Sequence, residues 1–216
     1  MPSPVSVPDR TGRAVRDRYW LIPLTRAAAA FVVAGVTTFT ALHSPQFGLL
    51  VFSGYAIASG LVLAALSAAL MSDRIAARLF TVQGLLGVIA GVVALVASGS
   101  GLPFFQYLVT IWAAATGLIE LYCGLRSGRQ QAVPGPMRQR DWRGVGAFTA
   151  ALALVFVFLP GDAVLAVGVF GVYAVMLGVY LAIAAFSLKW GAQSVPSAPS
   201  LDVRGQAANS QEAKSQ

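Results

Sequence analysis

This chain has few charged residues, one cysteine and one histidine. Only 11% of its 216 residues are Asp, Glu, Lys or Arg, whereas 57% are hydrophobic, and the mean hydropathy is +0.73. So few polar side chains cannot cover the surface of a water-soluble globule of this size. The composition therefore excludes an ordinary soluble domain and predicts a polytopic membrane protein of the all-α class.

The scarcity of reactive side chains excludes several chemistries. The single cysteine, Cys123, excludes an intrachain disulfide and a multi-cysteine metal site, and its apolar surroundings favour a small buried residue. The single histidine, His43, leaves little material for a zinc or haem site. The sequence also has no Ser-His-acid set, no phosphate-binding loop and no pair of carboxylates within its apolar runs. We therefore expect no enzymatic activity, no cofactor, no metal site and no nucleic-acid partner.

Long apolar runs make up most of the chain. Each of six runs has 18 to 26 residues, which suffices to cross a hydrocarbon core of about 30 Å at 1.5 Å per residue. The runs are Trp20–Leu42, Phe47–Leu70, Phe80–Ala97, Phe104–Arg126, Trp142–Leu159 and Ala163–Leu188. We expect a six-span membrane domain over residues 18–190, with a disordered basic tail at 1–17, a second disordered tail at 191–216 and an internal loop at 127–141.

The first run could also belong to a signal peptide, because basic residues precede it. Phe39 and Ala41 near its end do not form the small-x-small pattern of a cleavage site, so we expect a retained first helix.

The cations indicate the orientation of the six spans. Fourteen of the fifteen Lys and Arg residues lie in the two tails, around the second-to-third and fourth-to-fifth connections, or at the C-terminal end of the last run. The other three connections contain none. By the positive-inside rule, both termini and the two basic connections are expected in the cytoplasm, which implies a multi-pass protein of the inner or plasma membrane.

The runs repeat a pattern in pairs. Each odd-numbered run opens with Arg-x-aromatic, each even-numbered run has a proline at its head, and each even-numbered run contains a glycine. The residues are Arg18-Tyr19-Trp20, Arg78-Leu79-Phe80 and Arg140-Asp141-Trp142, then Pro45, Pro103 and Pro160, then Gly60, Gly117 and Gly178. The pattern predicts three tandem helical hairpins, about residues 18–74, 78–126 and 140–189, which have the same orientation. Inverted repeats, a common feature of alternating-access transporters, are not visible.

With these recurrences, residues 18–190 resemble the HdeD-like family of short-repeat bacterial membrane proteins. The resemblance implies an integral membrane protein associated with acid resistance, in a family whose members generally lack an assigned chemical activity.

Glu120 is the only acidic residue inside a long apolar run. A charge at this depth costs roughly 2–3 kcal/mol or more, so it should face protein and have a partner. Arg26 lies six residues inward from Trp20, and Glu120 lies six residues inward from Arg126, so both are about 9 Å from the cytoplasmic ends of their helices. Gln83 has a similar depth. We therefore predict a buried polar cluster of Arg26, Gln83 and Glu120. The competing interpretation is that Arg26 extends to the lipid headgroups, while Glu120 reaches the interface or stays protonated.

Three further features have two interpretations each. His43 and Asp162 could form a pH-sensitive pair on the outer face, although Asp162 could equally cap the last helix. The basic tail and the connection containing Arg126, Arg129, Arg138, Arg140 and Arg143 could bind anionic lipids or a partner, or they could serve only as a topology signal. Small residues spaced four apart, at Gly87 and Gly91 and at Ala113 and Gly117, could pack helices within the chain or form a homo-oligomer contact.

The sequence thus favours a structural or stress-related integral membrane protein that acts through lipids or other membrane proteins. The alternative is a small channel or transporter with a site at Glu120. Few polar side chains lie between Glu120 and the outer edge, and these are Ser and Thr residues that normally bond their own helix backbone.

The predicted orientation can be tested with single cysteines in a Cys123→Ala background. In intact cells, Ser100→Cys should react with an impermeant thiol reagent, because it lies in a connection without cations. Ser127→Cys should react only after the cells are opened. Labelling of both positions in intact cells, or of Ser127→Cys alone, would contradict the six-span orientation.

Overall fold

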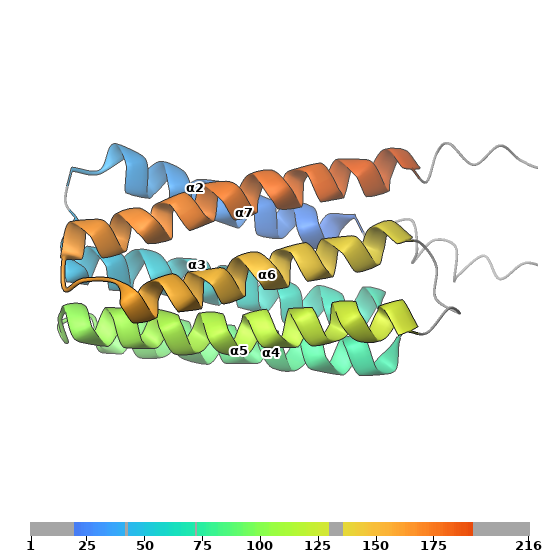
Figure 1. The fold of residues 1–216 in the computed structure, drawn as a ribbon, viewed down its shortest axis with the longest axis horizontal. Helices are drawn as coiled ribbons and strands as arrows, with labels where there is room; N and C mark the ends of the chain where they lie inside the picture. Colours follow the sequence, from blue (N-terminus) through green and yellow to red (C-terminus); the bar gives the residue numbers. More distant parts are fainter. Residues whose placement is uncertain (1–19, 42, 72, 130–135, 192–216) are drawn as a thin grey trace, which may run out of the picture.

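The computed structural model describes residues 20–41, 43–71, 73–129 and 136–191. For residues 127–129, 136–141 and 191 it describes the backbone but not the side chains. In these ranges the chain forms six helices, which confirms the all-α class. They are α2 (Leu21–Phe39), α3 (Pro45–Leu70), α4 (Arg74–Val96), α5 (Leu102–Arg129), α6 (Pro136–Phe158) and α7 (Ala163–Gly191). The helices lie side by side in one elongated bundle, and the start of α2 and the end of α7 are at the same end of it (Figure 1). We call this end the terminal end.

Local sequence signals account for several helix starts. Ser44 accepts a hydrogen bond from the Phe47 backbone N–H (3.2 Å), and Pro45 follows as the first helical residue of α3. Asp73 accepts from the Ile75 N–H (2.9 Å) at the start of α4. Before α5, Gly101 has a φ of +83°, which a residue with a Cβ rarely adopts.

The helix boundaries differ from the predicted runs in two places. The first run was expected to reach Leu42, but α2 ends at Phe39 because Thr40 is already extended. The expected loop at 127–141 is partly helical, since α5 continues to Arg129 and α6 begins at Pro136. Proline is tolerated in a first helical turn, where its missing N–H would have no partner. The predicted tail at 1–17 and residues 192–216 of the second lie outside the described residues.

Five helices are long and apolar enough to cross a membrane: α2, α3, α4, α5 through Arg126, and α7 through Trp190. The apolar part of α6, Trp142–Phe158, is shorter. These lengths are consistent with a multi-pass membrane protein. They do not by themselves confirm the predicted sixth span.

The closest helix pairs are not those of the predicted hairpins. The hairpins would pair α2 with α3, α4 with α5, and α6 with α7, but the most extensive contacts join α3 to α4, α5 to α6, and α2 to α7. Glycine explains the first two pairs. A Cβ added at Gly60 would lie 2.5 Å from the Gly84 carbonyl oxygen, and one added at Gly117 would lie 2.7 Å from the Ala150 nitrogen. Backbones can approach this closely only where side chains are missing.

The α2–α7 pair brings the first and the last of the described helices into contact. A Cβ at Gly171 of α7 would lie 2.8 Å from the Thr37 methyl group of α2. At the terminal end, the Lys189 Nζ lies 4.9 Å from the centroid of the Trp20 ring, a cation–π contact between the same helices. Contacts along both halves of these helices therefore close the bundle.

The small-residue faces pack inside the chain. Gly87 and Gly91 of α4 face the backbone of α3, where added Cβ atoms would lie 3.2 Å from the Ala56 carbonyl oxygen and 2.9 Å from that of Ser53. Gly117 faces α6, and Ala113 is buried. At these positions the small residues therefore pack helices within the chain, and a homo-oligomer would have to use other surfaces.

The Gly60–Gly84 contact predicts that two alanine substitutions in α3 have different effects on the unfolding temperature. Gly60→Ala should lower the unfolding temperature in detergent, because overpacking typically costs about 1–3 kcal/mol. The matched control is Gly54→Ala, whose added Cβ would have no atom within 4 Å. This control should be neutral or stabilising by up to about 1 kcal/mol, since alanine favours helix more than glycine does. Equal shifts for the two variants would contradict the close backbone approach.

Candidate functional site

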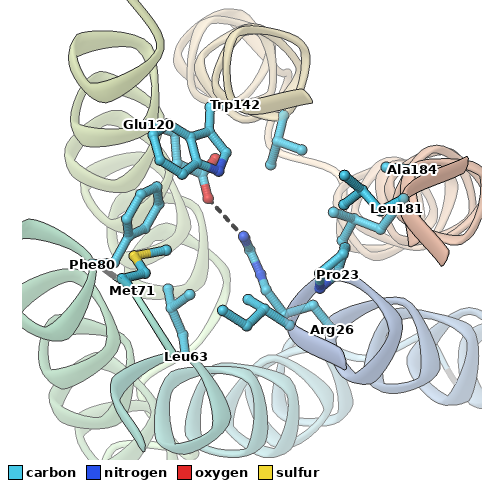
Figure 2. A pocket seen from close by; sticks show the side chains of 12 residues that line it. Pro23, Arg26, Leu63, Met71, Phe80, Glu120, Trp142, Leu181 and Ala184 are labelled. Carbon is cyan, nitrogen blue, oxygen red and sulfur yellow. Dashed lines mark hydrogen bonds and ion pairs between the residues drawn. The ribbon is translucent and has the colours of Figure 1, made fainter. Parts of the chain in front are cut away.

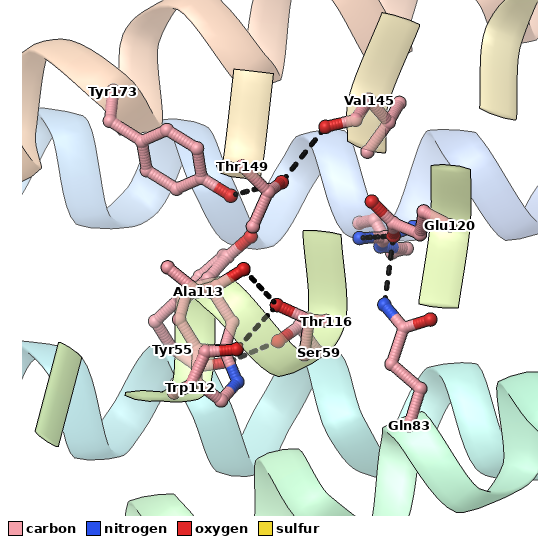
Figure 3. A network of polar contacts seen from close by, with 11 residues as sticks. Tyr55, Ser59, Gln83, Trp112, Ala113, Thr116, Glu120, Val145, Thr149 and Tyr173 are labelled. Carbon is pink, nitrogen blue, oxygen red and sulfur yellow. Dashed lines mark hydrogen bonds and ion pairs between the residues drawn. The ribbon is translucent and has the colours of Figure 1, made fainter. Parts of the chain in front are cut away.

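Glu120 of α5 is the centre of a buried polar cluster with Arg26 of α2 and Gln83 of α4. The Arg26 Nη2 donates to Glu120 Oε1 at 2.8 Å, and the Gln83 Nε2 donates to the same oxygen at 2.8 Å. Glu120 and Gln83 are 1% and 3% exposed, and the Arg26 side chain is 12% exposed. Figure 3 shows Gln83 and Glu120 pointing toward each other from neighbouring helices. The structure thus brings together all three residues of the predicted cluster.

Equal depth allows the two charges to meet. Arg26 lies in the second turn of α2, which begins at the terminal end, and Glu120 lies near the end of α5, which returns to that end. The chain directions are opposite, so residues far apart in the sequence reach the same level. An interfacial location of both charges, the competing interpretation, would require exposure that Glu120 does not have.

The cluster lies between two groups of buried apolar side chains. On the terminal side are Ile22, Leu63, Phe80 and Cys123, and on the other side is the main core, which includes Ala27, Ala56 and Ala113. Few water molecules can reach a pair in such surroundings, so the attraction between its charges is stronger than at a surface. The desolvation cost is also large, which makes the loss of either partner expensive.

Three other polar residues adjoin the cluster and were not predicted as part of it. Tyr55 of α3 and Tyr173 of α7 are buried near Arg26 and Glu120. The Tyr173 hydroxyl lies 3.1 Å from the hydroxyl of Thr149 on α6, which also donates to the Val145 carbonyl oxygen at 2.9 Å (Figure 3). Each of the six helices therefore contributes one side chain to what we call the polar layer: Arg26, Tyr55, Gln83, Glu120, Thr149 and Tyr173.

The sequence contains a repeated signal for the two tyrosines. Each even-numbered apolar run contains aromatic-Ala-x-x-x-Gly: Tyr55-Ala56 before Gly60, Trp112-Ala113 before Gly117, and Tyr173-Ala174 before Gly178. All three aromatic residues are buried. The predicted repeat includes these glycines but not the aromatic residue five positions before each of them.

His43 and Asp162, the predicted outer-face pair, form no hydrogen bond or ion pair with each other in the described part of the chain. The His43 Nδ1 lies 3.3 Å from the Ala41 carbonyl oxygen, and Asp162 Oδ1 accepts from the Leu165 N–H at 2.9 Å. Asp162 therefore caps α7, which was the second interpretation of this residue.

The basic connection contributes one defined contact. The Arg143 Nε donates to the Gly124 carbonyl oxygen at 3.0 Å and so links α6 to the end of α5. The side chains of Arg129, Arg138 and Arg140 lie outside the described residues. Among the described residues, no group of three or more His, Cys, Asp or Glu could hold a metal ion.

The ion pair predicts a strong coupling between two substitutions. Arg26→Leu and Glu120→Leu should each destabilise the protein by about 3 kcal/mol or more, because each strands a buried charge. The double variant should be much milder than the sum of the two, as measured by thermal unfolding in detergent. If the two losses simply add, the residues do not stabilise each other.

Comparison with protein-family models, with curated proteins and with solved structures gives no match for this chain. The HdeD-like resemblance therefore stays a prediction.

Proposed function

We propose that this chain is a six-span inner-membrane protein with cytoplasmic termini, and that it has a structural or stress-related role. It acts through contacts with lipids or other membrane proteins, and it neither transports a solute nor catalyses a reaction.

The observation that carries this proposal is a dense aromatic cluster that extends from the polar layer toward the end of the bundle opposite the terminal end. Its ring centroids lie 5.3 to 6.4 Å from their neighbours, and its members come from α3, α5, α6 and α7. They are Phe52, Tyr55, Phe105, Trp112, Phe156, Phe170 and Tyr173, all buried. A transport path from the polar layer to the far end would have to pass these rings, which pack mostly edge to face, with Phe170 and Tyr173 stacked, as in a protein core.

The hydroxyl groups in this part of the bundle are used by the helices themselves. Thr37, Ser53, Ser59 and Thr116 each donate to a backbone carbonyl oxygen three or four residues earlier, at 2.6 to 2.9 Å. Hydroxyls bonded in this way have used their only proton, so they cannot also donate a hydrogen bond to a passing solute. This favours a packed interior over a channel.

The outer surface is suited to lipid. On α4, Val82, Leu85, Ile89 and Val93 are each more than two-fifths exposed. Such a face is unfavourable in water and favourable in a hydrocarbon core or against another membrane protein.

The charges at the two ends support the proposed orientation. Arg74, Arg78, Arg126 and Lys189 lie near the terminal end, where anionic lipids of the cytoplasmic leaflet would attract them. The turns at the opposite end carry no Lys or Arg. The sixth span is supported by α6, which lies in the bundle beside the five helices of sufficient apolar length (Figure 1).

The HdeD-like resemblance favours acid stress as the condition in which the protein acts. A channel or transporter remains the second candidate function, favoured by the buried carboxylate of Glu120 beside a small cavity. Transport of protons or small ions would require this carboxylate to be reached from both ends of the bundle.

A flux assay separates the two functions. Purified protein in liposomes should give no proton or small-ion flux above that of empty vesicles under a pH or potential gradient, because the aromatic cluster blocks the path. The matched control is Glu120→Gln, which should leave the trace unchanged. A reproducible flux that Glu120→Gln abolishes would replace the structural function with the transport function.

A further inference from the structure

A cavity of about 30 Å³ adjoins the Arg26–Glu120 pair on its terminal side. All six helices or their ends contribute to its wall, and Arg26 and Glu120 are its two charged members. Most of the remaining wall is apolar or aromatic, as Leu63, Leu181 and Ala184 show in Figure 2. The same figure shows Arg26 reaching across this space toward Glu120.

The ion pair uses only part of its hydrogen-bonding capacity. Glu120 Oε1 accepts from both Arg26 and Gln83, whereas Glu120 Oε2 and the Arg26 Nε–H are buried and have no hydrogen-bond partner among the described residues. Glu120 Oε2 is an acceptor, and the Arg26 Nε–H is a donor. An unsatisfied buried polar group typically costs more than a hydrogen bond contributes, so a molecule that both donates and accepts would be held strongly between them.

The size of the cavity decides which molecule fits. A buried water needs roughly 10–15 Å³ of such space, whereas a cavity that binds benzene measures about 150 Å³. At about 30 Å³, the cavity can hold one or two waters and excludes a ring-sized organic ligand.

We propose that this cavity is a water-binding site, in which a water molecule accepts from the Arg26 Nε–H and donates to Glu120 Oε2. The water completes the hydrogen bonds of the ion pair and gives Glu120 a second link to Arg26. The site goes beyond the proposed function, because it would exist whether or not the protein transports a solute, and the flux assay does not test it.

A substitution that fills the cavity tests the proposal, because the unfolding temperature should fall if a water is displaced and rise if the cavity is empty. Ala184 of α7 is buried and lines the cavity. Ala184→Val should displace the water and lower the unfolding temperature in detergent by about 3 °C or more. In the Arg26→Leu/Glu120→Leu background, where no charged group needs the water, the same substitution should be neutral or should raise the unfolding temperature. Ala182→Val, a partly buried α7 position away from the cavity, controls for the effect of valine in this helix.

If Ala184→Val raises the unfolding temperature of the chain with Arg26 and Glu120 intact, the cavity is a dry void and the proposal is wrong. A second measurement does not depend on the variants being stable. In protein labelled with ¹⁵N-arginine, the Arg26 Nε–H should show a magnetisation-transfer cross-peak to water, assigned by its loss in Arg26→Lys. A resolved Arg26 Nε–H signal without this cross-peak would also overturn the proposal.

Discussion

Arg26 and Glu120 are removed from water, and the bundle must compensate for the several kcal/mol that this desolvation costs each ion. It does so with a direct contact of 2.8 Å, with a second hydrogen bond from Gln83, and by placing all three groups between two apolar clusters. The three residues come from α2, α4 and α5, so the ion pair links α2 to a helix that follows much later in the chain. A shift of any one of these helices along its axis would separate a charge from its partner, so the pair fixes the register of the helices around it.

The glycine contacts determine the distance between neighbouring helices, whereas the polar layer determines the axial register of helices across the bundle. Gly60 against Gly84 and Gly117 against α6 determine how closely two neighbouring helices approach. These contacts act only within the α3–α4 and α5–α6 pairs, because backbones approach this closely only where the glycines meet the facing helix. The Arg26–Glu120 contact has one satisfactory geometry. Buried polar groups have this specifying role in some coiled coils, and we interpret the polar layer here in the same way.

The aromatic cluster gives the bundle an interior that differs between its two ends. Toward the terminal end, the polar layer adjoins a small cavity, and toward the opposite end, rings such as Phe52, Phe105 and Phe170 fill the space. The charged site is therefore closed on one side by tightly packed side chains. This asymmetry supports the proposed structural role, because alternating access would need a path that can open on both sides.

The sequence by itself determined the helices, several of their caps and the depth of Arg26, Gln83 and Glu120, because run length, capping residues and residue counts act locally along the chain. It did not determine which helices are closest neighbours, so the pairing of α2 with α7 and the places of Tyr55 and Tyr173 in the polar layer appeared only in the structure. The physical reason is the apolar character of the helices on nearly every side. A helix of a soluble protein reveals its inner face by an apolar stripe, but a helix suited to lipid is apolar both inside and outside. Only the packing of all six helices together decided which faces meet.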